Sequence, residues 1–290
     1  MSLKYSITLA SFRNLDMPLE QTLDKLIEQG YDAIEMFGEP EKIRLKYLKD
    51  IFRSYHLCVC GITGLWGTIA ADGWKRKLLS SDPSLIRASQ KYVKQCIDMC
   101  QTLGGQKFNI CLFADDKLVS IDKNHEVISQ EQKKRIIGRV IPILTELSKY
   151  AKDRGVQMLV EPLNRYSTPY CTTAADAAAI ADQINQDNFG VLYDTFHMNI
   201  EEDSFEESIL NLDTLLQHTH FADNNRKMPG RGHIDFKSIL KALGKAGYNQ
   251  FISFEPILTT QHYEAETKFG LDFIKAIESG QLDRRGITSY

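Results

Sequence analysis

Four ionisable residues stand at the ends of four apolar runs in the second half of the chain. The run Val156 to Val160 ends in Glu161, and three later runs end in Asp194, His220 and Glu255. Three carboxylates and an imidazole held close together are unfavourable unless protons or a cation neutralise the carboxylates. Oxygen-rich ligation with one nitrogen suits Mn, Mg or Co. The four residues therefore predict a site for one divalent cation.

Each of these residues also has a plain structural explanation. Charged residues that follow strands often only cap a barrel and face water, and His220 could be a hydrogen-bonded core histidine. For any one residue alone, the structural explanation is favoured. The matching position of all four favours the metal site, because four such side chains rarely reach equivalent strand ends by chance.

The elements that must hold these residues alternate regularly between strand and helix patterns. Eight strands and eight helices, without a break in composition, predict an α/β fold: a (β/α)8 TIM barrel in which residues 1–290 form a single domain. A doubly wound open sheet is the alternative, but no Gly-rich phosphate fingerprint follows the first strand. We expect strands at 5–10, 32–37, 57–62, 107–113, 156–161, 189–194, 218–220 and 251–255, and helices at 18–29, 41–55, 82–103, 131–154, 174–185, 204–216, 236–246 and 263–279.

In such a barrel the C-terminal ends of the strands meet at one mouth, so the four residues would converge there. We expect a polar C-terminal tail from about residue 280 to be loose at its end. The six cysteines include no CxxC pair and predict buried free thiols rather than disulfides or a zinc site.

Composition narrows the possible partners. The chain has 35 basic and 38 acidic residues, for a net charge of -3. This balance gives no basic excess to attract nucleic acid or an anionic membrane. The sequence also lacks a run of about 18 apolar residues or a secretory leader. We therefore expect a cytoplasmic protein that binds neither nucleic acid nor membrane.

The residues around the strand ends carry a resemblance to a known superfamily. The chain resembles the xylose isomerase-like sugar isomerases and epimerases, and it is most like their D-tagatose and D-psicose 3-epimerase branch. The resemblance covers essentially the whole barrel. It implies an isomerase of carbohydrate metabolism that inverts C3 of a ketose. The matching segments are Val160–Arg165, Asp194–Asn199, His220–Arg226, Pro229–Gly232 and Phe254–Pro256.

The resemblance also implies roles for single residues. Glu161, Asp194, His220 and Glu255 would bind one divalent ion, typically manganese, with magnesium, cobalt or zinc as alternatives. Glu161 and Glu255 would be the acid/base pair, one on each face of the sugar. The chemistry agrees, because a proton beside a carbonyl leaves only if the developing enediolate is stabilised. A homodimer or homotetramer is also implied.

Contacts to the sugar are a further implication. His197 and Arg226 would hold oxygens beside the reacting carbon; a surface histidine and a solvated arginine are the alternatives. Trp66 would form an apolar wall against the sugar or merely cover the barrel top. His218 shares the inward face of its strand with His220, and either orients a ligand or packs inside the barrel. Glu35, near the end of the second strand, could also face the pocket.

Ser167 departs from the ketose 3-epimerase pattern, in which a glutamate at this position helps to hold the terminal oxygens of the ketose. The exact sugar, and whether it is phosphorylated, therefore stay open. The rival activities are an aldose–ketose isomerase of the hydroxypyruvate isomerase type and an inosose dehydratase. An endonuclease IV-type repair nuclease would need histidines after strands three and four, where this chain has Thr63 and Phe113. A non-catalytic sugar or metal binder is the last alternative.

Overall fold

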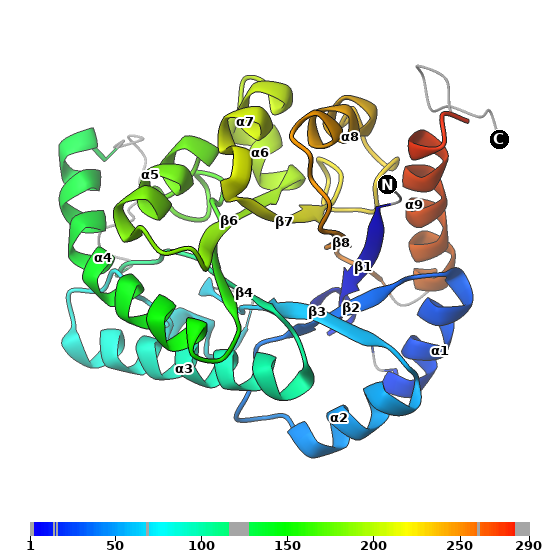
Figure 1. Cartoon of the computed structure of the whole chain (residues 1–290), viewed down its shortest axis with the longest axis horizontal. Coiled ribbons are helices and arrows are strands. Elements are labelled where there is room, and N and C mark those ends of the chain that lie inside the picture. Colours follow the sequence, from blue (N-terminus) through cyan, green and yellow to red (C-terminus); the bar gives the residue numbers. More distant parts are fainter. Residues whose placement is uncertain are drawn as a thin grey trace.

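Eight parallel strands close into a barrel, in sequence order, with β1 beside β8 (Figure 1). The computed structural model describes residues 3–13, 15, 17–67, 70–115, 128–259 and 262–281. The predicted (β/α)8 barrel is confirmed. The strands are β1 (Lys4–Thr8), β2 (Ala33–Phe37), β3 (Cys58–Thr63), β4 (Lys107–Ile110), β5 (Gln157–Val160), β6 (Phe189–Asp194), β7 (Leu216–Phe221) and β8 (Phe251–Phe254).

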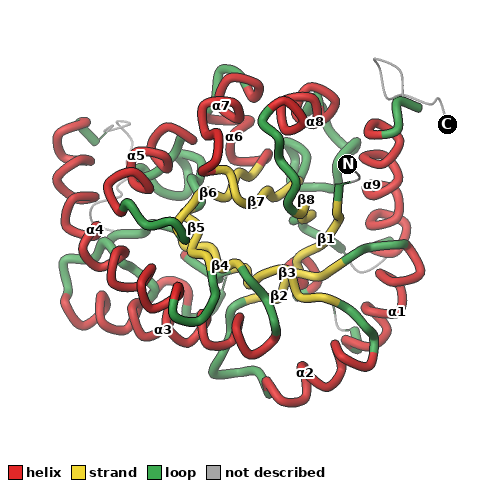
Figure 2. Tube along the Cα trace, viewed as in Figure 1, coloured by secondary structure: helices red, strands yellow, loops and turns green. Residues whose placement is uncertain are grey.

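A ring of helices surrounds the ring of strands (Figure 2). The sequence predicts eight helices, whereas the described residues form nine α-helices, because α6 begins directly after β6. The helices are α1 (Leu19–Gln29), α2 (Leu45–Ser54), α3 (Pro83–Leu103), α4 (Gln130–Lys152), α5 (Ala174–Ile184), α6 (Thr195–Glu201), α7 (Phe205–Leu212), α8 (Phe236–Lys245) and α9 (Tyr263–Glu278).

Local side-chain chemistry sets several of these boundaries. Thr8 ends β1 earlier than expected, because its hydroxyl accepts the N–H of Ala10 and starts a 3-10 helix. Asp82 caps α3 in the predicted manner, with proline in the first turn. The predicted helix 204–216 is too long, since α7 gives way at Asp213, whose φ is +46°. The predicted strand 107–113 ends at Ile110.

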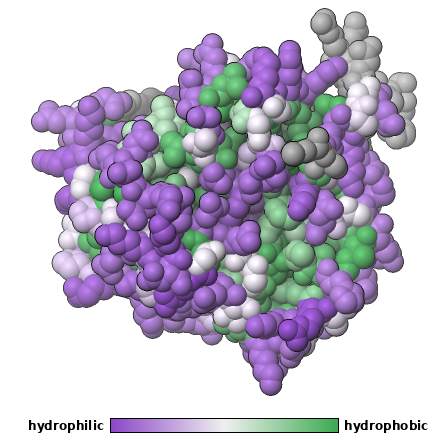
Figure 3. Space-filling view, viewed as in Figure 1, coloured by the Kyte–Doolittle hydropathy of each residue, from purple (hydrophilic) through white to green (hydrophobic). Residues whose placement is uncertain are grey.

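The core lies inside the barrel and between the barrel and the helices. Strand residues are almost all buried, as expected for a parallel sheet covered on its outer face. All six cysteines are free and five of them are buried, which confirms the prediction of free thiols. Figure 3 shows hydrophilic side chains over most of one face, with hydrophobic ones gathered on the side of α1 and α2.

Two expectations concern the chain ends and membranes. Most of the predicted polar tail, residues 282–290, lies outside the described residues. None of the described helices combines the length and apolar character needed to cross a membrane.

Candidate active site

The four predicted metal ligands come together at the C-terminal ends of their strands. Glu161 follows β5, Asp194 ends β6, His220 lies near the end of β7 and Glu255 follows β8. Each can offer one ligand atom so that all four atoms lie within 4.8 Å of one another. Register explains part of this, because Asp194 pairs with His220 across β6 and β7. Residues far apart in sequence thus form one compact polar cluster.

Arg226 lies against two members of this cluster. Its guanidinium donates to Asp194 Oδ2 at 2.6 Å and to Glu255 Oε2. The guanidinium also lies 4.8 Å from the ring centroid of Phe196, a cation–π contact. The arginine therefore neutralises part of the negative charge that the carboxylates bring together.

The loop that carries Arg226 is held by Asp223, to which the sequence assigned no role. Asp223 is fully buried, and its carboxylate accepts the backbone N–H groups of Asn224, Gly230, Gly232 and Ile234 at 2.8–3.1 Å. Its main-chain carbonyl accepts the N–H of Arg226, which has a φ of +58°. One carboxylate thus fixes the turn that aims Arg226 at the cluster.

His197 lies on α6, which Asp194 caps. Asp194 Oδ1 accepts the N–H of Phe196 at 2.7 Å and that of His197 at 3.4 Å. His197 Nδ1 accepts the backbone N–H of Asn164 at 3.1 Å. A neutral imidazole that accepts at Nδ1 carries its proton on Nε2, so His197 is a hydrogen-bond donor through that atom.

Burial decides the charge of His197. Burial lowers the pKa of His197 to about 4, against the opposing effect of the Asp194 carboxylate. The imidazole is therefore neutral at physiological pH. A neutral, oriented imidazole can polarise a substrate oxygen without adding another positive charge beside Arg226.

The two glutamates have pKa values displaced in opposite directions. Burial raises the pKa of Glu161 to about 8, and the carboxylates of Glu255 and Asp194 add to the rise. Burial also favours a higher pKa for Glu255, but Arg226 and His220 outweigh it and lower the pKa below its usual value. Paired carboxyl groups whose pKa values are pushed apart are typical of acid/base sites.

Glu161 has further partners, on β4 and directly after it, that the sequence does not reveal. Asn109 Nδ2 donates to Glu161 Oε2 at 2.6 Å, and the Cys111 thiol lies 3.5 Å from the same oxygen. Asn109 Oδ1 in turn accepts the N–H of Gly64. A lone asparagine within a buried strand was the available signal, because buried amides need partners.

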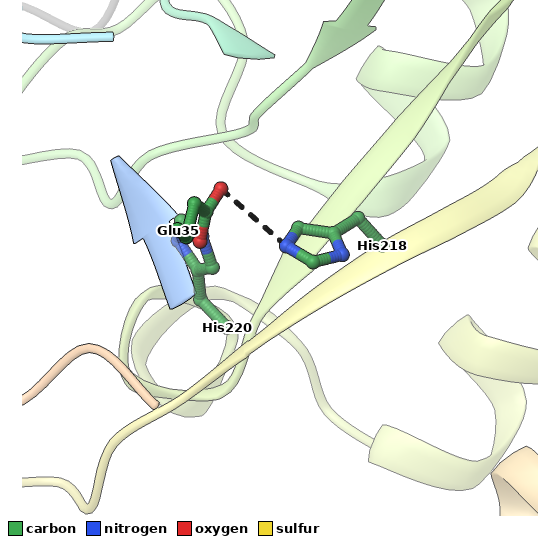
Figure 4. A group of neighbouring side chains, drawn as sticks. All are labelled: Glu35, His218 and His220. Carbon is green, nitrogen blue, oxygen red and sulfur yellow. Dashed lines mark hydrogen bonds and ion pairs between the residues drawn. The ribbon is translucent and has the colours of Figure 1, made fainter. Parts of the chain in front are cut away.

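Glu35 lies inside the barrel beside the cluster, between the two histidines of β7. It contacts His220 Nε2 at 2.9 Å and His218 Nε2 at 3.4 Å (Figure 4). Burial favours a higher pKa for Glu35, but His220 and His218 outweigh it and hold the pKa well below its usual value. Glu35 is therefore an ionised carboxylate in a fully buried position.

Comparison with known proteins agrees with this geometry. Residues 23–277 match the family of xylose isomerase-like TIM barrels. The chain belongs to this family. The match spans most of the barrel and includes all four residues of the cluster.

Relatives within the family include ketose 3-epimerases. The chain is 28% identical to an L-ribulose 3-epimerase of Methylomonas sp. over 227 residues, covering 78% of this chain and 74% of the relative. It is 29% identical to a D-psicose 3-epimerase of Ruminiclostridium cellulolyticum over 241 residues, covering 81% and 77%. A crystal structure of D-psicose 3-epimerase with D-tagatose from Clostridium cellulolyticum H10 has a TM-score of 0.78 at 24% identity and covers 95% of this chain and 99% of that chain.

The donor set of the cluster fits the divalent cation expected in this family. His220 Nδ1 is buried and has no hydrogen-bond partner among the described residues. It lies 3.0 Å from Glu255 Oε2 and 3.9 Å from Glu161 Oε1, without hydrogen-bond geometry to either. A buried nitrogen facing carboxylate oxygens is suited to an ion such as Mn or Mg.

The remaining predicted sugar contacts, Trp66 and Ser167, are buried to different extents. Trp66 is 1% exposed and packs edge-on against Tyr92, with ring centroids 5.4 Å apart. Its indole Nε1 is buried without a partner among the described residues. Ser167 is partly buried, and its hydroxyl lies 3.4 Å from Asn164 Oδ1. Neither contact identifies a ligand.

Proposed function

We propose that this protein is a divalent-metal-dependent ketose 3-epimerase. The observation that carries the proposal is the pair Glu161 and Glu255, which come from different strands and meet in one buried nitrogen–oxygen ligand set with Asp194 and His220. The ketose 3-epimerases among its relatives support the same reaction.

In this proposal the two glutamates move the proton. Glu161 follows β5 and Glu255 follows β8, so they approach the cluster from strands three apart in the barrel. Glu255, held ionised by Arg226 and His220, removes the proton from C3. Glu161, in its protonated form, returns a proton to C3 from the other face, and the configuration at C3 inverts.

Glu161, Asp194, His220 and Glu255 are the residues that would hold the cation. A divalent ion bound there would supply Lewis-acid stabilisation of the negative charge that develops on the sugar oxygens. We favour manganese, with magnesium, cobalt and zinc as alternatives, because the carboxylate-rich set suits hard ions.

Three further side chains orient the sugar in this proposal. His197 donates from Nε2 to a substrate oxygen, and Arg226 binds a second oxygen beside the reacting carbon. Trp66 contributes the indole N–H that lacks an acceptor. Ser167, which is shorter than the glutamate of ketose 3-epimerases, leaves more room at the far end of the sugar.

The test is direct turnover of a panel of ketoses. The protein, loaded with Mn²⁺, is incubated with D-fructose, D-psicose, D-tagatose and L-ribulose, and the products are separated by chromatography. Epimerisation in D₂O should place deuterium at C3. Absence of C3 inversion for every ketose would overturn the proposal.

An aldose–ketose isomerase is the second candidate, favoured by one observation. Ser167 stands where ketose 3-epimerases carry a glutamate that holds the terminal oxygens, so recognition of a free ketose differs here. The same cluster could then move a proton between C1 and C2. Deuterium at C1 or C2, with formation of an aldose, would select this activity.

A further inference from the structure

Glu35 is the centre of a buried polar network that the proposed reaction does not use. Its side chain projects from β2 into the barrel and is 2% exposed. Glu35 Oε2 accepts a hydrogen bond from Ser253 Oγ at 2.8 Å and lies 2.9 Å from His220 Nε2. Figure 4 shows the carboxylate facing both His220 and His218. Three strands, β2, β7 and β8, thus place polar groups at one point inside the barrel.

The chemistry of the carboxylate decides which nitrogen of His220 carries the proton. An ionised carboxylate can only accept hydrogen bonds. The proton shared between Glu35 and His220 therefore lies on Nε2. The other ring nitrogen, Nδ1, faces Glu161 and Glu255, and in the neutral imidazole that a metal ion requires it keeps its lone pair.

We infer that Glu35 is a positioning residue that holds His220 in the tautomer and orientation needed to bind the metal ion through Nδ1. This inference rests on the proposed metal site. Histidine ligands in proteins commonly donate their second N–H to a carboxylate, and loss of that partner weakens metal binding by roughly 10- to 100-fold. Ser253, opposite His220 in the register of β7 and β8, keeps Glu35 in place.

A second metal site is the competing explanation. Glu35, His218 and His220 can offer ligand atoms within 4.8 Å of one another. An ion there would take His220 Nε2 as a ligand, so that no proton could remain on it. Metal stoichiometry separates the two explanations: one ion per chain supports the positioning role, and two ions per chain would overturn it.

Calorimetric titration of the full chain with Mn²⁺ measures the effect. Glu35→Leu removes the acceptor at similar volume and should weaken binding on the order of 10- to 100-fold. Glu35→Gln retains an oxygen that can accept from Nε2–H and should recover most of the affinity. Equal affinity of the Leu variant and the native chain would refute the role, as would a Gln variant as weak as the Leu variant.

Glu39→Leu is the matched control. Glu39 is also a buried carboxylate, on the loop after β2, but it pairs with Arg76 at 3.1 Å and with Lys42 at 3.5 Å rather than with His220. This variant should lower stability without changing Mn²⁺ affinity. If the native chain itself binds no divalent ion, the proposed function fails. If the native chain binds the ion and the Glu35 variants bind it equally well, this inference alone fails.

Nitrogen NMR gives a readout on the native chain that does not depend on folding of a variant. With Mg²⁺ bound, which is diamagnetic, His220 should show a protonated Nε2 and an unprotonated Nδ1. The Nε2 proton should exchange slowly because it is buried and hydrogen-bonded. A proton on Nδ1 instead would overturn the inference.

Discussion

The two glutamates show how environment separates chemically identical residues. Both are within reach of His220, yet Arg226 donates to Glu255 and not to Glu161. Asn109, a neutral donor, is the hydrogen-bond partner of Glu161. The charged partner lowers the pKa of one carboxyl group, whereas burial raises that of the other. The proposed roles of base and acid follow from this asymmetry.

Glu255→Gln tests the role of the base. The amide keeps the size of the side chain but cannot accept a proton from carbon, so turnover should fall by at least about 10²- to 10⁴-fold. Sugar binding, measured by calorimetry, should be largely retained. Glu266→Gln is the control, because Glu266 pairs with Arg231 at the surface, away from the cluster. Near-native turnover of Glu255→Gln would contradict the assignment.

His197 should make the metal-free protein less stable in mild acid. An unfolded chain protonates this histidine below about pH 6.5, whereas the folded chain does so only near pH 4. Between these values the unfolded state binds more protons, so the free energy of unfolding falls as the pH falls. The loss should be about 2 kcal/mol at pH 5 relative to pH 7.

Urea denaturation in EDTA at the two pH values measures this loss. The variant His197→Asn cannot be protonated in this range, so its stability should vary less with pH by about the same amount. An identical pH dependence in the two proteins would show that burial does not keep His197 neutral.

At the scale of elements, two short segments aim the side chains that contact the substrate in the proposed reaction. Helix α6 carries His197 and begins where Asp194 caps it. The loop after β7 carries Arg226 and is held together by Asp223. Each segment depends on a single carboxylate that accepts several backbone N–H groups.

Asp223→Ala should therefore loosen the loop. Four backbone donors, of which that of Ile234 is buried, would lose a charged acceptor, and we expect the free energy of unfolding to fall by about 3 kcal/mol. The KM for sugar should rise because the loop no longer holds Arg226 against Asp194 and Glu255. Asp235→Ala is the control: Asp235 caps α8 through Ser238 N, so its loss should cost only about 1 kcal/mol and leave KM unchanged. Similar losses for both variants would argue against the role of Asp223.

At the scale of the whole molecule, the cluster connects four strands of a closed barrel. A bound ion would link β5, β6, β7 and β8, and it would bind only the folded chain. Metal at about 100 times its Kd should then add about 2.7 kcal/mol of stability. In scanning calorimetry, Tm should rise when Mn²⁺ is added and should return to the metal-free value when excess EDTA is added. A Tm independent of metal would count against the site.

Oligomeric state and cellular location stay predictions. A dimer or tetramer is expected from the family resemblance, and light scattering coupled to size-exclusion chromatography measures it directly.

Much of the fold could be predicted from local pattern alone. Strand and helix periods repeat eight times, caps such as Asp82 and Ser129 mark helix starts, and glycines such as Gly30 mark helix ends. The sequence does not predict helix α6, because its seven residues are too few for a helical period to be recognised. For its cap, Asp194, the position at a strand end predicts a metal ligand and gives no helix signal.

The sequence by itself determined the barrel and the four residues at the strand ends, because strand alternation and residue type are local properties. Only the tertiary structure decided which nitrogen of His220 faces the carboxylates, which glutamate Arg226 neutralises, and that Asn109 and Glu35 contact the cluster. Those contacts join residues 29 to 185 positions apart. They depend on barrel closure and strand register, which no local pattern records.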